Sequence, residues 1–230
     1  MNIHFFDTVR ASEVTDALEK IIKGGFPRRE LFLVTALASG IAGIGLLTDE
    51  VVLIIGSMIV APLLLPLLSV GVGVAALDMK LTLNSLKGVV IGCSVSVLFV
   101  IPLALLLSST DYQNNASYYA TIRPSVESAL VAGFAGVVSA FAVSKKELSD
   151  SMAGVAISVA LIPPLAATGI ALADLNMQSL LSTAGQFAMN VGLIILTSAI
   201  IFRYLDFDKS IATIRKNMRK ESRKKKSEEK

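Results

Sequence analysis

Apolar residues gather along the chain in six long stretches that short polar segments separate. The stretches cover about residues 31–47, 51–77, 88–107, 125–143, 151–173 and 179–202. An α-helix rises ~1.5 Å per residue, so about 20 apolar residues cross the ~30 Å hydrocarbon core of a bilayer. The pattern therefore predicts an all-α, polytopic membrane protein with six transmembrane spans.

Two of the apolar stretches contain prolines in their interior. The stretch at 51–77 is free of charge over 27 residues and holds Pro62 and Pro66, and the fifth stretch holds Pro163 and Pro164. Proline lacks an amide hydrogen, and its ring clashes with the carbonyl four residues earlier. We therefore expect the second and fifth spans to be broken helices.

A shift of 98 residues places the first proline-containing stretch on the second. It brings Pro66 onto Pro164 and Gly71 onto Gly169, with nine identities over 28 positions and no gap. We interpret this as an internal duplication of three spans. Because three is an odd number of crossings, the second copy enters the membrane from the opposite side. The predicted fold is two inverted three-helix repeats whose broken helices meet near the midplane.

The polar segments divide the chain into five parts. Residues 1–30 have apolar positions at helical spacing and predict an amphipathic segment, cytoplasmic or interfacial. The first membrane repeat covers 31–107, an extracytoplasmic loop 108–124, and the second repeat 125–202. A basic cytoplasmic tail follows at 203–230.

Composition and charge agree with a membrane protein and predict its orientation. The chain is 53% hydrophobic and 17% charged, against about 25% charged residues in soluble domains. Of the 21 Lys and Arg residues, all except Arg123 fall in segments that six spans would place on one side. Basic residues accumulate on the cytoplasmic side. We expect a multi-pass protein of the cell (inner or plasma) membrane with both termini in the cytoplasm.

The predicted breaks indicate a binding site. Each proline deprives a backbone carbonyl of its helical partner, and such carbonyls survive in a membrane only inside protein or beside water. Hydroxyls near the breaks, and two amides spaced by four residues on the last span, would complete a polar pocket. The candidate residues for a small solute or ion are Ser57, Met58, Pro62, Pro66, Ser69, Ser158, Val159, Ala160, Pro163, Pro164, Thr168, Gln186 and Asn190. Two alternatives stay open: the prolines kink helices for packing alone, and the two amides only join helices.

Glu127 is the one carboxylate that the pattern places close to the interior of a span. It would pair with Arg123 four residues earlier, or lie at a helix N-terminus, where a negative charge is stabilised. We name Glu127 and Arg123 as candidates for coupling or gating.

Several other kinds of chemistry are excluded or disfavoured. His4 and Cys93 are the only histidine and cysteine, so we expect no metal site and no cofactor. Phosphate-binding loops and hydrolase motifs are missing, which predicts that the protein is not an enzyme. The basic tail is better suited to anionic lipid headgroups than to nucleic acid.

The motifs GSMIVAPLLLPLL at 56–68, SALVAGFAGVVSA at 128–140 and GVAISVALIPPLAATGIAL at 154–172 resemble a family of bacterial and archaeal membrane proteins. That family is called domain of unknown function 389, or the uncharacterised hydrophobic domain. The resemblance covers roughly residues 31–200, whereas longer members carry an additional soluble region. It implies an integral polytopic protein and supplies no substrate.

Two functions fit these observations. The first is a small secondary transporter or channel-like protein with a midplane site for a neutral or monovalent solute between the broken helices. The second is a membrane scaffold or lipid-binding module that does not transport and acts through oligomer contacts and its basic tail. Small residues at four-residue spacing, as at Gly88, Gly92 and Ser96, favour close helix contacts and a homo-oligomer in either case.

Overall fold

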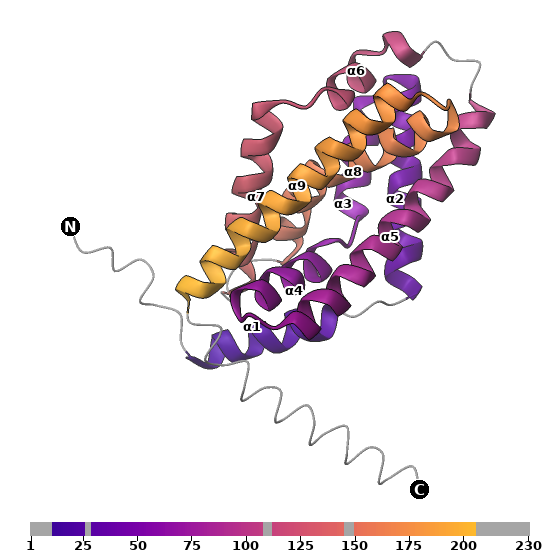
Figure 1. The fold of residues 1–230 in the computed structure, drawn as a ribbon. Coiled ribbons are helices and arrows are strands. Elements are labelled where there is room, and N and C mark those ends of the chain that lie inside the picture. Colours follow the sequence, from indigo (N-terminus) through magenta and orange to yellow (C-terminus); the bar gives the residue numbers. More distant parts are fainter. Residues whose placement is uncertain (1–10, 26–28, 108–111, 145–149, 206–230) are drawn as a thin grey trace, which may run out of the picture.

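The computed structural model describes residues 11–25, 29–107, 112–144 and 150–205. Most of the predicted basic tail and the first ten residues lie outside these ranges. Within them every regular element is a helix (Figure 1). The elements are α1 Ala11–Gly24, α2 Arg29–Thr48, α3 Val51–Val60, α4 Leu64–Ala75, α5 Met79–Leu106, η1 Tyr112–Asn114, α6 Ala116–Ile122, α7 Val126–Ser144, α8 Asp150–Ala173 and α9 Met177–Tyr204.

Five helices, α2, α5, α7, α8 and α9, are long and apolar enough to cross a membrane. The pair α3 and α4 forms one further bent span or a re-entrant loop. The chain is therefore an all-helical, multi-pass membrane protein, as its apolar stretches predict.

The polar segment at 78–87, which the sequence predicts as a loop between the second and third spans, is helical from residue 79. Residues 79–87 already belong to α5, because the side chain of Asp78 accepts hydrogen bonds from the backbone N–H groups of Lys80 (3.1 Å) and Leu81 (3.2 Å). An Asp at this position satisfies N–H groups that the first turn of a helix leaves unpaired. The polar start of α5 thus continues directly into its apolar part.

The second span is interrupted between Val60 and Leu64, and α3 and α4 are bent by 58° at this point. Pro62 lies in the link, and Ala61 before it has an extended backbone with ψ of 121°. A residue that precedes proline is pushed out of the helical conformation by the proline ring, which explains where α3 ends. Pro66 lies inside α4, in its first turn.

The predicted break in the fifth span is wrong. The helix α8 runs without interruption through Pro163 and Pro164. Prolines are tolerated in a membrane helix when neighbouring groups pair with the carbonyls that they leave free. For Pro164, Asn190 of α9 provides this pairing by donating to the carbonyl oxygen of Ala160.

Two helix-to-helix turns, from α4 to α5 and from α8 to α9, have the same backbone. Leu77 and Leu175 both adopt a left-handed conformation, with φ of 54° and 55°. The N–H of Asp78 bonds to the Gly73 carbonyl at 2.8 Å, and that of Asn176 bonds to Ala171 at 3.0 Å. These positions match under the shift of 98 residues. Both turns have the Schellman hydrogen-bond pattern and then an Asp or Asn that caps the next helix.

Helix contacts also correspond between the two halves of the chain. The helix α2 packs on α5 as α7 packs on α9, and α4 packs on α9 as α8 packs on α5. In the last two contacts Gly71 meets Ser198, and Gly169 meets Val100. A Cβ atom at Gly169 would lie 2.7 Å from the Val100 Cβ, so glycine permits this close approach.

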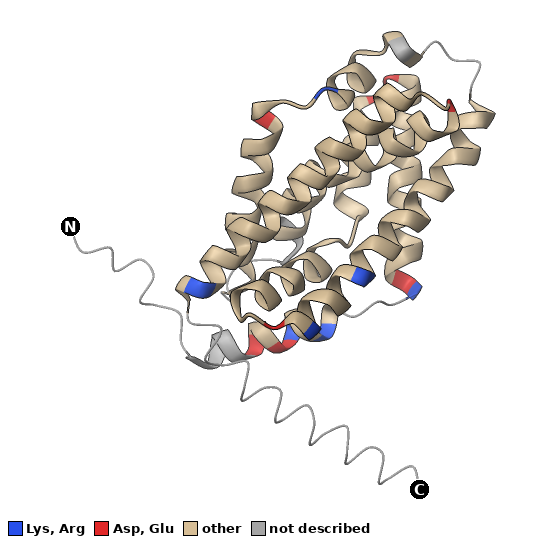
Figure 2. Cartoon of the chain, viewed as in Figure 1, with Lys and Arg blue, Asp and Glu red and all other residues tan. Residues whose placement is uncertain are grey.

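The helix α1 lies across one end of the bundle, where it packs on α4 and α7 (Figure 1). Its apolar side chains Ala17, Leu18, Ile21 and Ile22 are buried. Figure 2 shows that Lys and Arg residues of the described part gather at this end. The helix α6, which Arg123 follows, lies at the opposite end (Figure 1).

Candidate functional site

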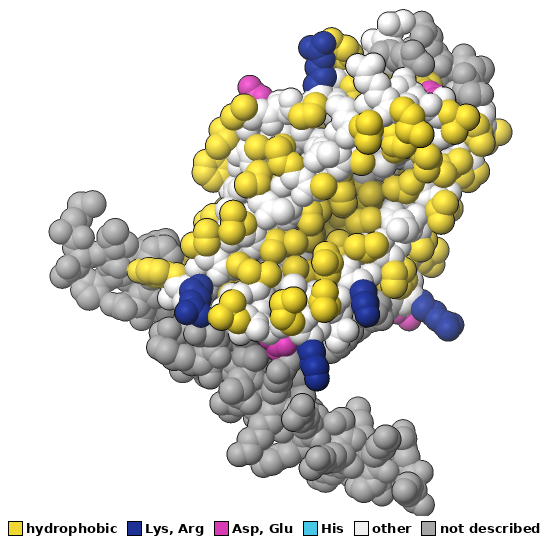
Figure 3. Space-filling model, viewed as in Figure 1, with side chains coloured by type: hydrophobic (Ala, Val, Ile, Leu, Met, Phe, Trp, Pro, Cys, Tyr) yellow, Lys and Arg dark blue, Asp and Glu magenta, His cyan; other side chains and the backbone are white. Residues whose placement is uncertain are grey.

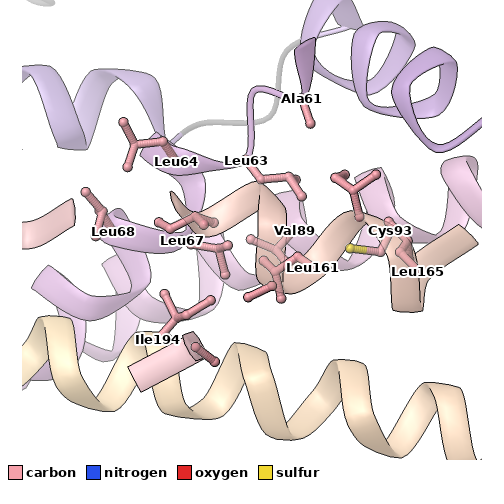
Figure 4. Packing of buried hydrophobic residues seen from close by; sticks show 14 of the residues in the cluster. Ala61, Leu63, Leu64, Leu67, Leu68, Val89, Cys93, Leu161, Leu165 and Ile194 are labelled. Atoms are coloured by element: carbon pink, nitrogen blue, oxygen red, sulfur yellow. The ribbon is translucent and has the colours of Figure 1, made fainter. Parts of the chain in front are cut away.

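The interrupted span crosses α8 at its break, and the crossing is packed. The hydroxyl of Ser158 on α8 donates a hydrogen bond of 3.1 Å to the carbonyl oxygen of Ala61. Ala61 and Ser158 are buried, and so are Leu63 and Leu161 beside them (Figure 4). One carbonyl of the extended link is therefore satisfied by a partner from the second half of the chain.

A pocket of about 370 Å³ lies against this break. Its wall includes residues 59–62 at the end of α3 and in the link, together with Gly24, Leu31 and Gly154. Gly24 ends α1 and Leu31 lies in the first turn of α2, so the pocket is at the end of the bundle where the basic residues gather. Ala61 belongs to both the pocket and the packed crossing.

On the opposite side of the crossing, Asn190 pairs with the backbone of α8. Its amide nitrogen donates to the carbonyl oxygen of Ala160 at 2.8 Å, and both residues are buried near the middle of their helices. Pro164 has no N–H to offer this carbonyl. Both Ala160 and Asn190 are among the candidates from the sequence, but their pairing was not predicted, and α8 does not break there.

Gln186, one turn before Asn190 on α9, extends the polar cluster toward α7. Its amide nitrogen donates to Asn190 Oδ1 at 3.0 Å and to the hydroxyl oxygen of Ser128 at 2.6 Å. Asn190 also donates to Ser128, at 3.1 Å. The oxygen Oε1 of Gln186 is buried and has no hydrogen-bond partner. Such an acceptor is costly in a bundle interior unless something donates to it.

These contacts form two groups of polar residues on either side of α8, which together we call the polar path. It consists of the Ala61 carbonyl, Ser158, the Ala160 carbonyl, Asn190, Gln186 and Ser128. One end reaches the pocket at the break, and the other reaches the first turn of α7. Sequence reasoning missed Ser128. The signal for it was its position one residue after Glu127, at the start of a span that faces α9.

Other candidate residues are engaged elsewhere. Ser57 donates to the Ile54 carbonyl of its own helix at 2.6 Å, and Thr168 donates to the Pro164 carbonyl at 2.7 Å. The hydroxyls of Ser69 and Ser85 pair at 2.8 Å. Val159 is 40% exposed. The remaining candidates are Met58 and Pro62, which are half-buried, and Pro66 and Pro163, which are buried.

Glu127 and Arg123 do not form an ion pair within the described part of the chain. Arg123 instead lies over the ring of Tyr119, 4.2 Å from its centroid. Both charged residues are exposed, and Glu127 occupies the first turn of α7. Of the two arrangements expected for Glu127, the helix N-terminus is the one observed.

The end of the bundle that carries Arg123 is held by polar contacts that sequence reasoning did not identify. The amide of Asn115 donates to the carbonyls of Leu46 (3.2 Å) and Leu47 (2.9 Å) at the end of α2. The carboxylate of Asp49 accepts from the backbone N–H of Ser117 at 3.0 Å. Hydrogen bonds from Ser117 hold the pKa of Asp49 below its ordinary value of 3.8. Together they fix α6 against α2.

Groups of three or more potential metal-binding side chains do not occur among the described residues. The buried polar side chains of this part are hydroxyls and amides throughout. The chemistry available along the polar path is therefore hydrogen bonding and coordination by neutral oxygen atoms.

The chain is similar to proteins that have no assigned activity. The family described as Domain of unknown function (DUF389) matches residues 58–196, more than half of the chain. The chain is 31% identical over 179 residues to Uncharacterized protein MJ0678 of Methanocaldococcus jannaschii. This match covers 76% of the chain and 53% of the relative, so the chain spans about half the length of that protein. No solved structure matches.

Proposed function

Because the chain belongs to the family described as Domain of unknown function (DUF389), whose name assigns no activity, we propose a function from its geometry. The protein is a small secondary transporter or channel-like membrane protein. It moves a small solute or ion along the polar path, past the crossing of the interrupted span and α8, without converting it chemically.

The observation that carries this proposal is the buried acceptor of Gln186 beside Asn190 and the carbonyl that Pro164 leaves free. Helix packing alone requires no unpaired oxygen at a buried position. A passing solute that donates a hydrogen bond, or a cation, would satisfy it. The pocket at the break offers a way in from the basic end of the bundle.

An internal duplication of three spans would allow alternating access. The matched turns at Leu77 and Leu175, and the matched contacts at Gly71 and Gly169, are the features that two copies of one three-helix unit would share. In an inverted repeat, the two units rock against each other around a central site. The crossing at Ala61 and Ser158 joins the units and would part during such a motion.

The chemistry of the path favours a neutral or monovalent solute. Hydroxyls, amides and backbone carbonyls supply dipoles but no full charge, so a multivalent ion would meet no buried counter-charge among the described residues. Lys and Arg gather at the end with α1 and α4, and basic residues accumulate on the cytoplasmic side of a membrane. This end therefore faces the cytoplasm in our proposal.

A scaffold that does not transport is the second candidate. The packed crossing favours it, because Ser158 and the buried leucines close the path in this conformation. Such a protein would act through contacts between copies of the chain. Gly56 and Gly185, where an added Cβ would meet nothing within 4 Å, leave room for another helix.

Flux through proteoliposomes distinguishes the two candidates. Vesicles with and without the protein are exposed to gradients of glycerol, urea, NaCl and KCl, and their volume change is followed by stopped-flow light scattering. For a transporter, at least one probe crosses faster than through protein-free vesicles. The variant Gln186→Leu abolishes the difference, whereas Thr183→Val, a buried hydroxyl on α9 that bonds to its own helix, preserves it. Equal rates with and without protein for all probes would favour the scaffold.

A further inference from the structure

A second cavity lies outside the polar path, between the spans α5 and α9. It is a groove of about 630 Å³ with α8 as its floor, and Figure 3 shows a hollow with hydrophobic side chains on the face that α5 and α9 form. Val89, Cys93 and Val97 of α5 line one side, and Phe187 and Val191 of α9 line the other.

The two sides of the groove are matched positions of the two halves. Leu86, Val89, Val90, Cys93 and Ser94 become Ala184, Phe187, Ala188, Val191 and Gly192 under the shift of 98 residues. The second set has the smaller residue at three of its five positions, Ala184, Ala188 and Gly192, which lie four residues apart. Their small side chains leave the groove deep along α9.

The lining leaves no free hydrogen-bond donor of a hydroxyl for a polar ligand. Its two hydroxyls belong to Ser94 and Thr168, and each donates to a carbonyl of its own helix, at 2.9 Å and 2.7 Å. The helix faces beside the groove are apolar and exposed, as at Ile91 and Leu196. In a membrane this surface meets hydrocarbon, so the occupant of the groove is a hydrocarbon chain.

The length of the groove fits one leaflet. From Leu86 to Leu98, α5 rises roughly 18 Å, at ~1.5 Å per residue, and half of the hydrocarbon core is about 15 Å. One acyl chain would run along the groove from the end of the bundle where α5 begins.

A positive charge marks that end. Lys87 is exposed and lies on the same face of α5 as Val90 and Ser94, which are three and seven residues further on and line the groove. A lysine at the edge of an apolar surface extends its amine toward the headgroup region. We propose that the groove binds one acyl chain of an anionic phospholipid whose phosphate pairs with Lys87. This proposal does not depend on transport.

The absence of tryptophan from the chain makes the test direct. A Leu98→Trp variant places the single tryptophan at the groove, and Leu181→Trp places it on an exposed part of α9 outside the groove. Each variant is reconstituted in phosphatidylcholine vesicles that contain increasing fractions of phosphatidylglycerol with brominated acyl chains, which quench tryptophan fluorescence.

We expect quenching of Leu98→Trp to reach half of its maximum at about fivefold less brominated phosphatidylglycerol than quenching of Leu181→Trp. This factor corresponds to ~1 kcal/mol for one basic residue near an anionic headgroup. When Lys87→Gln is combined with Leu98→Trp, the preference for phosphatidylglycerol disappears. The control Lys80→Gln, which lies further from the groove, keeps this preference. Gly192→Phe fills the groove and removes the preference. Gly185→Phe does not, although an added Cβ meets open space at both glycines.

Two results would overturn the proposal. Equal quenching of both reporters would mean that the groove holds no lipid in preference to bulk. The second result is that Leu98→Trp is quenched by neither brominated phosphatidylglycerol nor brominated phosphatidylcholine, and that the protein is a dimer. If Gly192→Phe then gives monomers and restores quenching, a second copy of the chain occupies the groove.

Discussion

The side-chain amide of Asn190 donates a hydrogen bond to the carbonyl oxygen of Ala160, which the ring of Pro164 deprives of its helical partner. A residue 30 positions further along the chain thus pairs with the carbonyl that Pro164 frees, in a helix that continues through both prolines. The same contact lies on the polar path, so one amide serves the fold and the candidate site.

This relationship predicts strong coupling between Asn190 and Pro164. Asn190→Leu leaves the Ala160 carbonyl unpaired and should lower the free energy of unfolding by about 1–3 kcal/mol. In a Pro164→Ala background the helix supplies its own N–H, so the same change should cost less. A double-mutant cycle of thermal unfolding in detergent measures the difference. Additive effects of the two substitutions would show that the contact does not stabilise α8.

The contact between Ser158 and Ala61 gives a second prediction. Ser158→Ala removes the donor to a buried carbonyl in the extended link, and we expect a loss of roughly 1 kcal/mol of stability. The control is Ser94→Ala, because Ser94 is exposed and donates only to a carbonyl of its own helix. Thermal unfolding of both variants in one detergent checks this. Equal midpoints for the two variants would contradict a role of Ser158 at the crossing.

The close helix crossings predict different outcomes at two glycines. At Gly169, an added Cβ would lie 2.7 Å from the Val100 Cβ, so Gly169→Ala should force α8 and α5 apart and lower the unfolding midpoint. At Gly185, it would meet nothing within 4 Å. Gly185→Ala should therefore raise stability by up to ~1 kcal/mol, since alanine favours a helix over glycine. A higher midpoint for Gly169→Ala would contradict the packing of this crossing.

How far the sequence predicts this structure depends on how local each cause is. The apolar stretches and the break at Pro62 follow from residues near them in sequence. Whether Pro164 interrupts α8 does not follow from nearby residues, because the carbonyl that it frees pairs with Asn190 on another helix. Ser128 and the groove between α5 and α9 require the helices to be assembled, since they arise from side chains of different spans.

The hydrogen bonds of Asp49 predict a dependence of stability on pH. The folded state holds the pKa of Asp49 below its ordinary value of 3.8. Its contribution to stability is therefore present above the pKa of the unfolded state and is lost as pH falls through the folded value. Asp49→Asn should be less stable than the wild type near neutral pH and should lose less stability below the ordinary pKa. Parallel curves of unfolding midpoint against pH would contradict this.

The distribution of basic residues predicts which end of the bundle faces outward. Asn114 lies in η1 and is exposed, at the end opposite the basic residues. In a Cys93→Ala background, Asn114→Cys in intact cells should react with a membrane-impermeant maleimide added outside, because cytoplasmic segments carry the excess of Lys and Arg. A cysteine at Lys80, which begins α5 at the other end, should react only after the membrane is opened. If the cysteine at position 114 reacted only from the cytoplasmic side, the whole orientation would be reversed, and the pocket at the break would open outward.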